Sequence, residues 1–143
     1  MALTVDHLRR TADTLQTAVV QLRAVQDPQE PLYELFRLAA IKSFELSLEM
    51  SVKLLRKALK AYEIRPRDVD RLVFKDVFRE AGRRGLMDEA AIERWFAYRE
   101  NRNTTAHDYG EGFARQTLAL LPAYVQDVRA LASRLEEVFD AST

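Results

Sequence analysis

A guanidinium and an imidazole lie five positions apart in the sequence, at Arg102 and His107, and the phenol of Tyr109 follows two positions later. They belong to a polar stretch, residues 101–112, which also contains two of the four glycines in the chain. A connection between two helices needs only a few turn residues. The stretch therefore contains charged and titratable side chains that a connection does not require, and it is the candidate functional site.

These residue types suit the cleavage of RNA without a metal ion. A ribose 2′-hydroxyl attacks the neighbouring phosphate once its proton is removed, and a histidine can take or deliver that proton because its ordinary pKa is about 6.5. An arginine can bind the phosphate through two parallel hydrogen bonds and offset the charge of the transition state. On this interpretation His107 transfers protons and Arg102 holds the phosphate.

The spacing sets a condition on the geometry. On one continuous helix, Arg102 and His107 would point roughly 140° apart. A bend between them would bring them together, and so would a two-fold axis that sets each pair beside its symmetry mate. A structural interpretation stays open, in which Arg102 is a cation favoured by the dipole at a helix C-terminus, His107 is a polar loop residue and Tyr109 packs on a helix end.

The rest of the sequence leaves little room for other chemistry. There is no cysteine, which excludes disulfides and thiolate metal sites, and there are only two histidines, too few for a histidine-rich metal site in one chain. No glycine-rich phosphate loop and no zinc-binding helix with paired histidines are present. We therefore expect no metal and no cofactor in this chain. The second histidine, His7, is expected to be solvated.

Composition indicates an ordinary globular protein. The 143 residues, 48% hydrophobic and 31% charged, suit one domain spanning residues 1–143. No stretch approaches the ~20 apolar residues of a membrane span, and residues 1–10 lack the apolar core of a signal peptide, so we expect a cytoplasmic protein. The net charge is zero, but residues 53–107 carry 14 basic and 9 acidic side chains. A basic middle permits a local anionic ligand.

The spacing of apolar residues predicts two long helices in the first half of the chain. Residues 4–25 carry apolar side chains three or four positions apart, and residues 32–62 repeat them every seven positions, which is typical of helices in a bundle. Glu45 and Glu49 interrupt the second apolar pattern and are expected at its polar edge. Buried, they would need partners such as Lys53 or Arg102.

The second half of the chain predicts three more helices. One spans residues 66–81, with valines on one side and two glycines, Gly82 and Gly85, at its end. A short one follows Asp88, with Trp95 and Phe96 in the core. The last spans about 111–139 and is expected to kink at Pro122. The predicted fold is all-α, an antiparallel bundle of four main helices plus a short helix.

The candidate site resembles the motif of the HEPN toxins. In that motif an arginine is followed by four residues, a histidine, one further residue and a tyrosine, as at Arg102, His107 and Tyr109. A polar residue is usual directly after the arginine, and Asn103 fits. The flanking segments resemble, in the same order, the nucleotidyltransferase substrate-binding proteins; they are residues 42–53, 66–69 and 78–82 and Trp95.

This resemblance implies a HEPN-like helical bundle that forms a homodimer, with the motifs of both copies facing a shared cleft. Arg102 and His107 would cut RNA, either tRNA or mRNA. The implied partner is a cognate minimal nucleotidyltransferase acting as the antitoxin, which would hold ATP and Mg²⁺ and transfer AMP to the hydroxyl of Tyr109. A bulky anionic group there would obstruct the cleft and repel RNA phosphates. The expected supporting residues are Asn103, Glu45 and Glu49.

Two other functions remain open on the same residues. The chain could be a noncatalytic subunit that presents a substrate to the nucleotidyltransferase through the same basic cleft. It could also be a plain helical interaction module, as the seven-residue repeats allow, in which case residues 101–112 would tolerate substitution. The sequence departs from the resembled pattern at Gly110, where an acidic residue or asparagine is more usual, and at Leu48 and Val52, where aromatic residues are. None of these is a candidate catalytic group.

Overall fold

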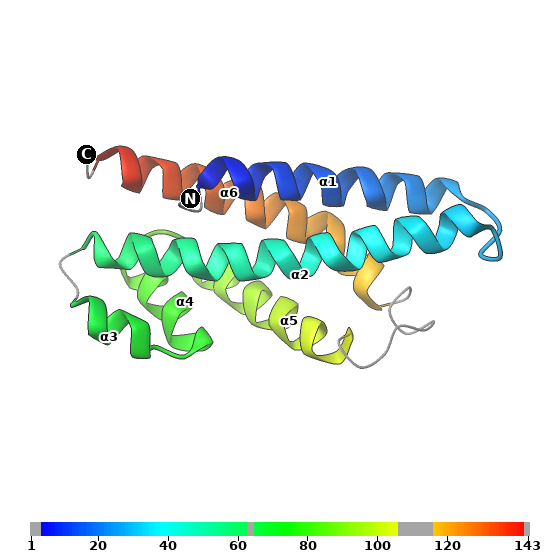
Figure 1. Ribbon diagram of the computed structural model, residues 1–143. Helices are drawn as coiled ribbons and strands as arrows, with labels where there is room; N and C mark the ends of the chain where they lie inside the picture. Colours follow the sequence, from blue (N-terminus) through cyan, green and yellow to red (C-terminus); the bar gives the residue numbers. More distant parts are fainter. Residues whose placement is uncertain (1–3, 63–64, 106–115, 142–143) are drawn as a thin grey trace.

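A computed structural model describes residues 4–62, 65–105 and 116–141, without the side chains of 103–105. The described residues are all-helical, with no strand, which confirms the predicted all-α fold (Figure 1). The helices are α1 (Val5–Ala24), α2 (Pro31–Lys60), α3 (Pro66–Arg71), α4 (Phe74–Arg83), α5 (Glu89–Thr105) and α6 (Leu118–Ala141). None of them is both long enough and apolar enough to cross a membrane.

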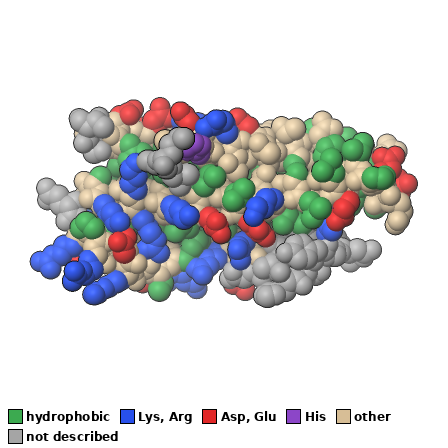
Figure 2. All heavy atoms as spheres, viewed as in Figure 1, with side chains coloured by type: hydrophobic (Ala, Val, Ile, Leu, Met, Phe, Trp, Pro, Cys, Tyr) green, Lys and Arg blue, Asp and Glu red, His purple; other side chains and the backbone are tan. Residues whose placement is uncertain are grey.

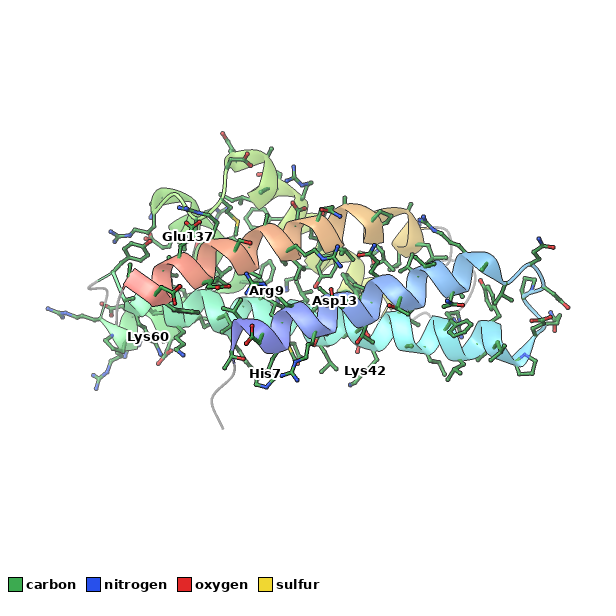
Figure 3. All side chains as sticks on the ribbon, turned by 90° about the horizontal axis from the view of Figure 1, so that it is seen from above. His7, Arg9, Asp13, Lys42, Lys60 and Glu137 are labelled. Atoms are coloured by element: carbon green, nitrogen blue, oxygen red, sulfur yellow. The ribbon has the colours of Figure 1, made fainter. Side chains whose placement is uncertain are left out.

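The helices form two layers around α2. Helices α1 and α6 pack along one side of α2, and α3, α4 and α5 lie on its other side (Figure 1). Arg9 of α1 lies between α1 and α6, where it pairs with Glu136 (Figure 3). The largest fully buried side chains come from five of the six helices: Leu8, Leu15, Leu22, Phe44, Leu54, Leu55, Leu59, Phe78, Trp95, Tyr98 and Tyr124.

Local capping explains where the first helix begins. The His7 backbone N–H donates to the Thr4 hydroxyl at 3.3 Å, and the Thr4 N–H donates to His7 Nδ1 at 3.1 Å. This reciprocal pair satisfies two backbone donors that a helix start leaves without partners. His7, expected to be solvated, is half-buried and caps the helix.

The single helix predicted over 66–81 is wrong, because the chain forms two helices there, α3 and α4. Leu72 between them is extended, with φ −65° and ψ 132°. The guanidinium of Arg56, on α2, donates to the carbonyls of Val69 and Leu72, each at 2.7 Å. A continuous helix would have used these carbonyls internally. The break also turns Val73 outward, 63% exposed, although the pattern had placed it on the buried side.

The two glycines after α4 have different roles. Gly85 adopts φ 74°, the left-handed conformation predicted for the end of the helix. Gly82 does not, and a Cβ there would lie 2.5 Å from Ile92 Cδ1, so this glycine allows α4 and α5 to approach. The Asp88 carboxylate then accepts from the Ala91 N–H at 2.8 Å, as predicted for a helix cap. The helix that follows has 17 residues and is not short.

The start of α6 depends on a contact with α1. Pro122 has no N–H to donate to the carbonyl of Leu118, four residues earlier. Arg23 of α1 donates to that carbonyl instead, at 3.2 Å. The helix was predicted to begin near residue 111, and residues 106–115 lie outside the described part of the chain.

Candidate functional site

The structure places Arg102 in the final turn of α5, where its side chain is half-buried. Asn103 follows in the same turn, and its side chain is outside the description. His107 and Tyr109 lie within residues 106–115 and are also outside it. The predicted convergence of these residues on one phosphate therefore stays a prediction, and the described part of the site is its support.

One hydrogen bond joins the two ends of the segment that carries the candidate residues. The hydroxyl of Thr117, which is fully buried, donates to Oδ1 of Asn101 at 2.7 Å. Buried hydroxyls need such a partner, because an unpaired one loses its bonds to water. Asn101 immediately precedes Arg102, so this bond holds together the described residues on either side of the stretch. Asn101 was part of the stretch singled out in the sequence, but its pairing with Thr117 was not predicted.

One turn before Arg102, α5 is fastened to α6 through Asp127. Tyr98 is buried, and its hydroxyl donates to Asp127 Oδ2 at 2.5 Å. Arg94 donates two further bonds to the same carboxylate, each at 2.8 Å. Burial, together with the bond to Asp127, raises the pKa of the Tyr98 hydroxyl, and hydrogen bonding to Asp127 raises the pKa of Arg94. The tyrosine therefore stays neutral and donates, and the arginine stays charged.

Behind this contact, Tyr124 of α6 connects three helices. Its hydroxyl is hydrogen-bonded to the Ser47 hydroxyl of α2 at 2.6 Å, and burial raises its pKa. Its ring meets those of Phe44, Tyr98 and Trp95 edge-on, with centroids 4.8, 4.9 and 5.7 Å away. Such edge-to-face contacts favour one relative orientation of the rings. The prediction that Trp95 belongs to the core is confirmed.

The signal for this polar contact was present in the sequence but was not used. Three serines of α2 are four residues apart and all are buried: Ser43, Ser47 and Ser51. Ser47 meets Tyr124 of another helix, whereas Ser51 donates to the Ser47 carbonyl of its own helix at 2.8 Å, so the spacing marks a candidate contact without identifying the partner.

The two glutamates proposed as supporting residues lie on the outward side of α2. Glu45 is half-buried and Glu49 is exposed. Neither is buried, so neither requires a compensating cation, and their part in the site stays a prediction. Among the described residues, no group of three or more histidine, aspartate or glutamate side chains is arranged to hold a metal ion.

Comparison with known proteins identifies a family, a related protein and two solved structures of similar fold. Residues 4–137 match the family described as "Nucleotidyltransferase substrate binding protein like". A Haemophilus influenzae protein named probable ribonuclease HepT is 33% identical over 98 residues, 68% of this chain. The match spans 66% of that protein, just under two thirds of its length.

Two solved structures resemble the fold. One, from Haemophilus influenzae and described as the fold of a substrate binding domain of a nucleotidyltransferase, has a TM-score of 0.80 at 29% identity, covering 93% of this chain and 99% of the other. A protein from Thermus thermophilus has a TM-score of 0.62 at 27% identity, covering 85% and 98% of the two chains.

Proposed function

The chain belongs to the nucleotidyltransferase substrate binding protein like family, which has the HEPN-like fold, and from that premise we propose that it is the toxin of a toxin–antitoxin pair. It acts as a metal-independent endoribonuclease through Arg102 and His107. A minimal nucleotidyltransferase partner neutralises it by attaching AMP to Tyr109. The observation that carries the proposal is Arg102 in the last turn of α5, beside the Asn101–Thr117 bond that joins the ends of the motif segment.

The proposed reaction needs only these two side chains and the RNA. His107 removes the proton of a ribose 2′-hydroxyl, the oxygen attacks the adjacent phosphorus, and the bond to the 5′-oxygen breaks. The leaving 5′-oxygen takes a proton from an imidazolium, and the products are a 2′,3′-cyclic phosphate and a 5′-hydroxyl. Arg102 binds the non-bridging oxygens as negative charge builds up on them. A permanently charged guanidinium suits that role at any physiological pH.

A second copy of the chain completes the proposed site. The outward side of the first half of α2, residues 31–46, is named the apolar half. It exposes four leucines, by 36–58%, beside the charged Lys42 and Glu45; the leucines are Leu32, Leu35, Leu38 and Leu46. A two-fold axis pairs one surface with itself, so the surface must be self-complementary, as an apolar one is. The end of α5 that carries Arg102 lies toward the same end of the bundle (Figure 1). Pairing through the apolar half thus sets two copies of the motif beside one cleft.

The catalytic assignment is tested by expressing the chain without its partner. Arg102→Ala and His107→Ala each lower RNA cleavage by at least about 100-fold, the usual effect of losing an acid–base group or a transition-state contact, and remove growth inhibition. His7→Ala is the matched control, because it removes the other histidine and only a helix cap, costing about 1 kcal/mol of stability. Undiminished cleavage in both site variants would show that the assignment is wrong.

The proposed modification is tested by co-expression with the nucleotidyltransferase encoded next to this chain. Mass spectrometry of the wild-type chain is expected to show an increase of one or more AMP units, and Tyr109→Phe is expected to show none. A wild-type chain that inhibits growth and stays unmodified beside an active partner would contradict the proposal.

A noncatalytic subunit is the second candidate function. The relative of known structure described as a substrate binding domain of a nucleotidyltransferase, aligned over 93% of this chain, favours it. This function predicts that the unmodified wild-type chain is harmless and leaves tRNA and mRNA intact.

A further inference from the structure

The outward side of α2 changes character along its length. Beyond Glu49 it carries three exposed lysines, Lys53, Lys57 and Lys60, at helical spacings of four and three, so they share one side of the helix. Exposed arginines follow in α3 and just before it. Figure 2 shows blue side chains gathered over this end of the molecule and green ones over the first half of α2. The basic face comprises Lys53, Lys57, Lys60, Arg65, Arg67 and Arg71.

Most cations of the basic face have no carboxylate partner within the described part of the chain. The ion pair that the basic face does make joins Lys60 to Asp70, at 2.8 Å. On α1 and α6, Arg9, Arg129 and Arg134 each pair with a carboxylate. Arg129, for example, lies 3.0 Å from Asp13. Asp68 lies among the arginines of α3 and offsets part of their charge. The basic face still carries a clear excess of positive charge.

Folding alone does not account for this arrangement. Lys53 and Lys57 are four residues apart on a helix, and like charges at that spacing are destabilising. Arg65 and Arg67 stand at the N-terminal end of α3, where the helix dipole disfavours cations. The dipole does favour Lys57 and Lys60 in the last turn of α2 and Arg71 in the last turn of α3, but it does not explain the other three residues. An external anion would offset these costs.

Two aromatic rings anchor the edge of this surface. The Lys57 ammonium lies 5.1 Å from the centre of the half-buried Phe139 ring, and the Arg84 guanidinium lies 5.6 Å from that of Tyr62. Cation–π contacts of this kind hold a cation in place without neutralising it. Both cations remain exposed, so their charge acts on a ligand outside the protein.

We propose that the basic face binds the phosphate backbone of a folded RNA substrate, at a place separate from the cleavage site. The inference rests on the proposed function. Arginine forks and lysine ammonium groups both bind phosphates, and arginine does so with two bonds at once. A protein partner would be expected to bury a central apolar cluster. The outward side of α2 exposes no large apolar residue beyond Leu46 in the described part of the chain.

The distance between the basic face and the other end of α2 sets the length of RNA that could reach both the basic face and the cleavage site. From Leu38, in the apolar half, to Lys57 there are 19 residues, or about 28 Å at the rise of an α-helix. Arg102 is in the last turn of α5, and this end of α5 lies toward the end of the bundle that holds the apolar half (Figure 1). A substrate that reaches both places must therefore span nearly one turn of a duplex, which is about 34 Å long in DNA. A single strand of about four nucleotides bound at the cleavage site would not reach the basic face, because neighbouring phosphates of a stacked strand are only about 3.4 Å apart.

The test measures RNA binding by the full chain in a His107→Ala background, so that nothing is cut. The probes are a fluorescently labelled tRNA and a labelled single strand of about four nucleotides. Lys53→Gln/Lys57→Gln is expected to weaken tRNA binding about tenfold and to lower the slope of log affinity against log salt by about 1.5, as for two lost phosphate contacts. Its affinity for the short strand should stay within about twofold.

The charge-matched control is Arg10→Gln/Arg129→Gln, on α1 and α6, which should leave tRNA affinity within about twofold. Equal loss in both double variants would show only the effect of net charge and would overturn the proposal. Unchanged tRNA affinity with slower modification of Tyr109 would also overturn it, because the basic face would then dock the nucleotidyltransferase. Cleavage by the wild-type chain is measured in a separate assay. If it fails, the proposed function is wrong, but the binding measurement still decides whether the basic face binds RNA.

Discussion

Both halves of α2 bury an inner side, which in the first half begins at Ala40, but their outer sides differ in character. Phe44 in the first half and Leu55 in the second are both fully buried. Outward, leucines of the first half give way to lysines in the second. The outer residues of both halves are exposed and do not contribute to the core. Under the two proposals each outer side has its own ligand, a second copy of the chain for the apolar half and the phosphates of RNA for the basic face.

The largest expected effect comes from breaking the apolar half. Leu35→Asp/Leu38→Asp places two carboxylates where the proposed two-fold axis brings like surfaces together, and like charges across an interface cost several kcal/mol. We expect a monomer by analytical ultracentrifugation and a loss of RNA cleavage of about 100-fold or more. Circular dichroism should stay unchanged, because neither side chain faces the core.

Val73→Asp is the control for that prediction, since Val73 is the most exposed large apolar side chain of the described residues, at 63%, and it lies outside α2. This variant should sediment and cleave like the wild-type chain. If Leu35→Asp/Leu38→Asp does so as well, the apolar half is not the dimer surface.

The second prediction compares Arg56, which points inward from the second half of α2, with Lys53, which points outward from it. Arg56→Met removes the donors to the Val69 and Leu72 carbonyls and should lower the free energy of unfolding by about 2–3 kcal/mol, since bonds from charged donors are the stronger ones. Urea denaturation measures it. Lys53→Met, outward on the same half, should change stability by less than about 0.5 kcal/mol. Equal effects of the two variants would contradict the inward role of Arg56.

The smallest expected effect on stability concerns the hydrogen bond between Tyr124 and Ser47 on the buried side of α2. Tyr124→Phe removes the bond to Ser47 and should cost about 1 kcal/mol. The loss is limited because the Ser47 hydroxyl keeps its bond to the Phe44 carbonyl, at 3.1 Å. Urea denaturation at pH 7 measures it, and a loss above about 3 kcal/mol would show that the ring packing had also been disturbed.

The same variant has a pH signature. Burial raises the pKa of Tyr124 in the folded chain, whereas an unfolded tyrosine ionises near pH 10. Above about pH 10 the unfolded chain therefore loses a proton that the folded chain keeps, and the free energy of unfolding falls as the pH rises. Tyr124→Phe should make this alkaline fall shallower, as shown by urea denaturation at pH 8 and at about pH 11. An unchanged slope would mean that the Tyr124 hydroxyl does not contribute.

The sequence predicted the parts of the molecule that depend on neighbours along the chain. The periods of apolar residues placed α1 and α2 within about two residues of their observed bounds, and Asp88 and Gly85 marked helix ends correctly. The motif around Arg102 pointed to the family. The helix over 66–81 was predicted wrongly, because nothing in its own pattern reveals that Arg56 binds the carbonyls of Val69 and Leu72.

The sequence by itself thus determined the helical class, the faces of the long helices and the order of the motif residues, because each of these repeats or lies within a few positions. Only the tertiary structure decided how the motif is supported, through Thr117 on Asn101 and Asp127 on Tyr98. It also divided the outer side of α2 into the apolar half and the basic face. Such contacts join residues 16 to 29 positions apart, and their partners are selected by packing, which no local pattern encodes.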